Sequence, residues 1–183
     1  MKSEVRIRKL FVKKLASEPI DSITVNSLCK ELEIERQTFY YHYRDIYEVL
    51  ESYLADIKEE YLVLSDEILL DRILTHFDKN IEVYAKIANS NLRDALFNFV
   101  FDIMMKEVSY RISLIDNSKE LSQTSIMEIS RYVSLYASEF VLDKLKDEFN
   151  YDENRVKNKL NVIISKEVLN AYIDGYLKNT SSI

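Results

Sequence analysis

The chain has 183 residues, of which 47% are hydrophobic, so it can bury a substantial core. Its single cysteine, Cys29, excludes an internal disulfide and a cysteine-based metal cluster. With only one Gly and one Pro, the sequence favours long helices joined by short polar links, and we predict an all-α fold. No N-terminal apolar segment and no run of about 18 apolar residues appears, so we expect a cytoplasmic protein without a membrane span.

Charge is distributed unevenly along the chain, whose net charge is -6. Residues 1–47 carry nine Lys or Arg and seven acids, whereas residues 48–183 carry 16 basic and 24 acidic residues. The first part is therefore net positive and the second is strongly negative. This asymmetry predicts an N-terminal domain that faces an anion, attached to an acidic C-terminal domain.

Three short helices are predicted at the N-terminus. The first has an apolar stripe, from Val5 to Leu15, opposite a row of Lys and Arg, and it ends before Pro19, which lacks a backbone N–H. Thr24 is expected to cap a second helix over about 25–32, because its hydroxyl can accept a backbone N–H bond. A turn at 33–35 then leads into a third helix over about 36–43. This pattern predicts a helix-turn-helix head.

A long fourth helix is expected to join this head to a C-terminal helical bundle. Asp45 is predicted to cap it in a capping box with Glu48, and apolar residues recur at helical spacing as far as Tyr61. A polar loop is expected at 116–123. Further helices are predicted over about 69–88, 92–115, 124–149 and 154–177. The one at 92–115 is apolar on most sides and is expected to be central.

The residues around the turn resemble the DNA-binding signature of tetracycline-repressor-like (TetR-family) regulators. The resemblance lies in Ile23-Thr24-Val25, Leu28-Cys29, Leu32-Glu33-Ile34 and the run Thr38-Phe39-Tyr40-Tyr41-His42-Tyr43. In addition, Asp78 to Tyr84 resembles the branch that contains dihydroxyacetone-kinase regulators. The resemblance implies a ligand-responsive regulator of transcription. Residues 1–47 would be its helix-turn-helix DNA-binding domain and residues 48–183 its ligand-sensing and dimerisation domain.

Several polar side chains of the head are candidates for contact with double-stranded DNA. Arg36, Gln37 and Thr38 would reach base edges, Arg most usefully at guanine and Gln at adenine. Tyr40 and His42 would donate to phosphates. Any one of these residues could instead be solvated surface. The predicted DNA-binding set is Thr24, Asn26, Ser27, Arg36, Gln37, Thr38, Tyr40, His42 and Arg44.

Three positions depart from the family pattern. Glu33 stands where Gly is frequent, Glu35 replaces a Ser or Thr cap, and Ile46 replaces a Lys that contacts phosphate, a contact for which Arg44 is the expected substitute. These departures and the modest basic charge of the head support an alternative, because the two acids would repel a polyanion and Ile46 cannot make the phosphate contact. In that alternative the chain is a helical adaptor that keeps the head as a protein-docking surface and has lost DNA binding.

The C-terminal domain contains aromatic and Met residues that either line a small-molecule pocket or belong to the core. The proposed pocket residues are Tyr53, Tyr61, Phe77, Tyr84, Phe97, Phe101, Met104 and Tyr136. His76 would contact a ligand or lie on the surface. No acid, base and nucleophile converge, so we predict neither an enzyme nor a cofactor or metal site. The last two helices correspond to those through which the resembled family forms a homodimer on a palindromic operator.

Overall fold

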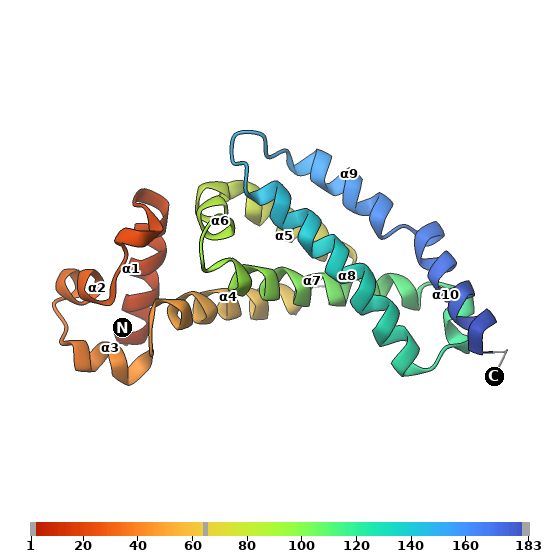
Figure 1. The fold of residues 1–183 in the computed structure, drawn as a ribbon, viewed down its shortest axis with the longest axis horizontal. Helices are drawn as coiled ribbons and strands as arrows, with labels where there is room; N and C mark the ends of the chain where they lie inside the picture. The colour runs from red at the N-terminus through yellow and green to blue at the C-terminus, as the bar shows by residue number, and fades with distance from the viewer. Residues whose placement is uncertain (1–2, 64–65, 181–183) are drawn as a thin grey trace.

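The computed structural model describes residues 3–63 and 66–180, apart from the side chains of 66–68 and 179–180. Across these residues the regular elements are helices and no strand occurs, which confirms the all-α fold. Figure 1 shows a small head of three helices at one end, a long helix that leads out of it, and a larger helical body. No helix in the described part of the chain has the length and apolar character needed to cross a bilayer.

The head consists of α1 (Ser3–Ser17), a short 3-10 helix η1 (Ile20–Ser22), α2 (Val25–Leu32) and α3 (Arg36–His42). Its centre is formed by Ile7, Phe11, Leu28 and Phe39, all of which are fully buried. These residues come from three helices, so each helix contributes its apolar side to one small core. The predicted three-helix head is confirmed.

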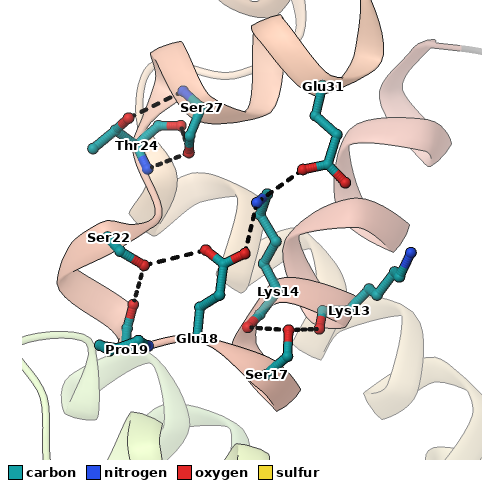
Figure 2. A network of polar contacts seen from close by, with 9 residues as sticks. All are labelled: Lys13, Lys14, Ser17, Glu18, Pro19, Ser22, Thr24, Ser27 and Glu31. Carbon is teal, nitrogen blue, oxygen red and sulfur yellow. Dashed lines mark hydrogen bonds and ion pairs between the residues drawn. The ribbon is translucent and has the colours of Figure 1, made fainter.

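Polar contacts fix the entry into α2 (Figure 2). The Thr24 hydroxyl accepts from the Ser27 backbone N–H at 3.1 Å, and the Ser27 hydroxyl accepts from the Thr24 N–H at 2.9 Å. Thr24 is thus the N-cap that the sequence predicts, and Ser27 completes a capping box. Lys14 of α1 binds both Glu18 at 2.9 Å and Glu31 of α2 at 2.8 Å, which ties α1 to α2.

Helix α4 (Ile46–Leu62) belongs to both the head and the body. Asp45 caps it, because its Oδ1 accepts from the Glu48 N–H at 2.9 Å. The Glu48 carboxylate, however, accepts from the backbone N–H of Arg44 at 2.6 Å, one residue before the N–H that the predicted capping box would use. The start of α4, which three residues separate from the end of α3, is therefore held by two hydrogen bonds.

The body comprises α5 (Asp66–Lys79), α6 (Ile81–Ala88), α7 (Arg93–Ser113), the 3-10 helix η2 (Asp116–Glu120), α8 (Gln123–Leu145), α9 (Glu153–Ile163) and α10 (Lys166–Thr180). It is built around α7, as the sequence predicts. This helix contacts α4, α5, α6, α8 and α10, and its most extensive contact is with α8.

Two helices that the sequence predicts as continuous are each divided into two in the structure, so these two predictions are wrong. The helix expected over 69–88 is interrupted at Asn80, whose side-chain amide donates to the His76 carbonyl at 2.8 Å. The helix expected over 154–177 is interrupted before Ser165, whose hydroxyl accepts from the Val168 N–H at 3.3 Å. In both places a short polar side chain bonds to the backbone and competes with the helical bond, while the apolar spacing continues across the break.

Two further boundaries differ from the sequence prediction. Helix α8 ends at Leu145 rather than near residue 149, and the loop expected at 116–123 contains η2. A turn at 147–150 replaces the last predicted turn of α8, because Asp147 accepts bonds from the backbone and side chain of Asn150.

The head contacts the body through α6 as well as through α4. Lys86 of α6 donates from its ammonium group to the Leu15 carbonyl at 2.8 Å and to the Ala16 carbonyl at 3.0 Å. Both acceptors lie in the last turn of α1, where carbonyl groups have no partner within the helix. Lys86 therefore holds the end of a head helix from the body.

Candidate nucleic-acid interface

The turn between α2 and α3 is made by a residue with a left-handed backbone. Glu33 has φ 54° and ψ 44°. Among the described residues, no other non-glycine residue has a positive φ. The next N–H, that of Ile34, donates back to the Cys29 carbonyl at 3.0 Å. The backbone thus turns sharply where many members of the resembled family have Gly, at the cost of a conformation that disfavours a side chain.

Helix α3 has a buried side and an exposed side. Phe39 is fully buried, and Tyr43, at the end of the helix, is 4% exposed and packs against it with ring centroids 5.9 Å apart. On the other side Arg36, Gln37 and Tyr40 are exposed to solvent. The buried aromatic residues therefore anchor α3 so that its polar side faces outward.

Two side chains on the exposed side of α3 contact each other. The guanidinium of Arg36 donates to the Tyr40 hydroxyl at 3.2 Å and lies 5.8 Å from the centroid of the Tyr40 ring. These residues are one helical turn apart, so the contact aligns both side chains along α3. Arg36 has five N–H donors, and this contact leaves others for a base edge or a phosphate.

The remaining predicted contact residues differ in their surroundings. Thr24 and Asn26 are exposed at the start of α2, whereas Thr38 and His42 are half-buried. The Ser27 hydroxyl already accepts from the Thr24 N–H and donates to the Thr24 carbonyl at 2.9 Å, so it is engaged in the cap. The structure thus groups Arg36, Gln37 and Tyr40 on one surface and leaves Ser27 as part of the scaffold.

Arg44 lies just beyond α3 and is exposed, and its Nε is 3.3 Å from the Glu48 carboxylate. This ion pair is largely open to water and is therefore weak. Tyr41, which was not among the predicted contact residues, is 84% exposed and packs edge-on against His42. Its place in the aromatic run was the signal that could have included it.

In the body, four of the predicted pocket residues gather around His76. The rings of Tyr61 and Tyr84 lie 5.5 Å and 5.6 Å from the His76 ring, and Phe77 packs edge-on against Tyr84. His76 Nε2 is 2.7 Å from the Tyr84 hydroxyl. The fourth member, Tyr53, is half-buried and adjoins Tyr84. We call Tyr53, Tyr61, His76, Phe77 and Tyr84 the aromatic cluster.

Burial controls the protonation of this aromatic cluster. It lowers the pKa of His76, while Glu60 has a smaller raising effect and Lys79 a smaller lowering effect, and it raises the pKa of Tyr84 well above the usual value. Both groups are therefore neutral near pH 7 and share a hydrogen bond inside apolar surroundings. His76 is a half-buried member of the body rather than a surface residue.

The other proposed pocket residues lie in different environments. Phe97 and Phe101 stack with centroids 6.0 Å apart and are half-buried, and Met104 is buried. Tyr136 is 65% exposed on the outer side of α8, so the expectation that it faces inward is wrong. The inner side of α8 carries small residues, including Ser134 and others that are fully buried, which lets α7 approach closely and leaves Tyr136 outside.

Tyr136 belongs to an apolar surface formed by α8, α9 and α10. We call it the tyrosine face and define it by Tyr132, Tyr136, Val162 and Tyr172, which are between 46% and 65% exposed. These residues surround a hollow of about 250 Å³. Among the residues that the structure describes, no group of three His, Cys, Asp or Glu side chains could hold a metal ion.

The comparisons with known proteins agree with this architecture. No family model matches the sequence, and no curated protein matches it. The chain has the fold of a solved structure, the dihydroxyacetone kinase operon activator DhaS, with a TM-score of 0.61 and 20% sequence identity. The alignment covers 89% of this chain and 94% of that protein. At this identity the match shows the fold alone.

Proposed function

We propose that the protein is a DNA-binding regulator of transcription whose helix α3 enters the major groove. The observation that carries this proposal is the exposed side of α3, where Arg36, Gln37 and Tyr40 stand together at the second helix of a helix-turn-helix unit. Arg36 and Gln37 suit guanine and adenine edges, and Tyr40 suits a phosphate. The fold shared with DhaS supports the same assignment.

We further propose that residues 1–47 are the DNA-binding domain and that residues 48–183 mediate dimerisation and ligand sensing. The tyrosine face supports a homodimer, because it exposes aromatic side chains beside a hollow. A two-fold axis would pack the tyrosine face of one copy against the tyrosine face of the other. Two heads related by that axis would bind a palindromic operator with half-sites about one helical turn apart.

The aromatic cluster is the proposed place for a small-molecule effector. A ligand that disrupts the hydrogen bond between His76 and Tyr84 would favour a different packing of α5 against α6. Because α6 also holds the end of α1 through Lys86, such a change would bias the position of the head. The expected coupling free energy is about 1–3 kcal/mol.

One observation supports the alternative, a helical adaptor without DNA binding. Glu33 and Glu35 are exposed next to the proposed DNA-binding side of α3, and Arg44 is paired with Glu48. The two functions differ in salt dependence, since phosphate contacts release counterions and binding weakens steeply as salt rises.

The test measures binding of the full-length protein to fluorescent duplexes from its own upstream region, over a range of salt concentrations. We expect Arg36→Ala to weaken specific binding by about 1–3 kcal/mol and to relax discrimination at one base pair, and Tyr40→Ala to weaken binding to all duplexes similarly. Lys119→Ala is the matched control, because Lys119 is exposed on η2 in the body. Wild-type affinity in both head variants would refute the assignment of this surface.

The dimer is tested separately by sedimentation of the protein and of Tyr136→Arg. An arginine at this exposed position is tolerated in a folded monomer but would place two like charges across a two-fold interface. We expect the variant to sediment as a monomer at concentrations where the wild type is a dimer. Equal sedimentation of the two would exclude the tyrosine face as the interface.

A further inference from the structure

A second hollow of the body lies apart from both the α3 surface and the aromatic cluster. It is formed where α8 ends and α9 begins, and its volume is about 560 Å³, within the range of small-molecule sites. Half-buried Phe140 and buried Val156 supply apolar surface, while Lys146, Arg155 and Lys159 supply positive charge. We call this hollow the α8–α9 groove.

In the part of the chain that the structure describes, three of the four cations that line the α8–α9 groove form no ion pair, and Lys144 is the exception. Among the described residues, no Asp or Glu lies within ion-pair distance of Lys146, Arg155 or Lys159. Lys157, on another side of the same helix, does have such a partner, since it binds Asp71 of α5 at 2.7 Å. The chain carries 31 acids against 25 basic residues, so a shortage of acids does not explain the difference.

The spacing of two of these cations costs helix stability. Arg155 and Lys159 are four residues apart on α9 and both are exposed, so their like charges lie on one side of the helix. Like charges at this spacing destabilise a helix by a few tenths of a kcal/mol. An arrangement with a local cost and no compensating ion pair among the described residues is typical of a functional site.

Three acids also line the α8–α9 groove, and each already has a donor of its own. Asp152 caps α9 by accepting from the Arg155 backbone N–H at 2.8 Å. Asp147 accepts from the Asn150 side chain at 2.7 Å, and Asp143 lies 3.1 Å from the Lys144 ammonium. With four cations against three acids, the groove keeps a positive excess, and the groups left to bind a ligand are the cations.

We propose that the α8–α9 groove binds a small organic anion, a carboxylate or a phosphomonoester that carries an apolar group. The anionic end would lie between Arg155 and Lys159, since Arg can bind two oxygens at once and Lys adds a point charge. The apolar end would cover Phe140 and Val156. The site is independent of DNA binding and of the aromatic cluster.

The test titrates the full-length protein with phenyl phosphate and with phenylacetate by calorimetry, at constant ionic strength. We expect saturable binding with one site per chain, and at least a tenfold loss of affinity in Arg155→Gln/Lys159→Gln. The matched control is Lys119→Gln/Lys166→Gln, which removes the same charge from exposed positions outside the groove and should stay within twofold of the wild type.

Two further probes define the chemical class. Benzyl alcohol, which lacks the charge, and inorganic phosphate, which lacks the ring, should each bind at least tenfold more weakly than phenyl phosphate. Stronger binding of phenyl phosphate than of phenylacetate would identify the anion as a phosphomonoester. Stronger binding of phenylacetate would identify it as a carboxylate. Equal affinity of the groove variant and the control variant, or the absence of saturation by both anions, would overturn the proposal. Neither measurement involves DNA, so this outcome is separate from the test of the proposed function.

Discussion

Replacing Lys86 by Met should loosen the attachment of the head to the body. The ammonium group of Lys86 donates to the carbonyls of Leu15 and Ala16 at 2.8 Å and 3.0 Å. These carbonyls lie in the last turn of α1, where a positive charge also interacts favourably with the helix dipole. Met keeps most of the apolar stem, so the substitution removes the donor and the charge with little change in packing.

The magnitude follows from these contacts. A hydrogen bond to a charged group contributes about 1.5–3 kcal/mol when it is well buried, but Lys86 is half-buried and one of its two bonds is exposed. Discounting for solvent, we expect Lys86→Met to lower the free energy of unfolding by roughly 1–2 kcal/mol. Lys86→Arg, which keeps a cationic donor, should recover part of this loss.

The assay combines urea unfolding with amide hydrogen exchange, and Lys119→Met on the exposed surface of η2 is the control. The destabilisation should be local, so the amides of α1 should exchange faster while those of α7 stay protected. If Lys86→Met unfolds like the wild type within about 0.3 kcal/mol and the exchange of α1 is unchanged, then the contact does not hold the head in solution.

Three other predictions concern single positions. Glu33→Gly should raise the free energy of unfolding by roughly 0.5–1 kcal/mol in thermal or urea unfolding, because φ 54° is strained for a side chain; no gain would mean that the turn is relaxed in solution. Because burial lowers the pKa of His76 from its ordinary value of 6.5, the stability of the wild type relative to His76→Gln should be fully present above pH 6.5 and fall as the pH drops below it; a flat difference between pH 7 and pH 5 would contradict this. Cys29 is 5% exposed and burial raises the pKa of its thiol, so a disulfide reagent should modify it only at the rate of local opening, and rapid modification of the native protein would show that α2 opens readily.

Sequence alone was sufficient for those features that depend on neighbouring residues. The cap at Thr24, the cap at Asp45, the burial of Phe39 and the sharp turn at Glu33 all follow from hydrogen bonds or side-chain spacing within a few residues. The head was predictable for this reason, and so was the exposed side of α3, since a helix with one buried side must turn the other outward.

The tertiary structure decided the features that depend on distant residues. Apolar spacing continues across Asn80, so the break in that predicted helix became visible only where its side chain bonds to the backbone. Tyr136 was predicted to line a pocket inside the C-terminal domain, but close packing of α7 against the small residues of α8 leaves it exposed. Lys86 lies some 70 residues from the carbonyls that it binds.

The distribution of charge also depends partly on the sequence alone and partly on the tertiary structure. Sequence showed that basic residues concentrate in the head and acids in the body, which local counting can establish. It did not show that Lys157 pairs with a carboxylate of α5 whereas Arg155 and Lys159, on the same helix, line a groove and form no ion pair among the described residues. Whether a charge is paired depends on which helix packs beside it, and that is fixed only when the helices assemble into a common core.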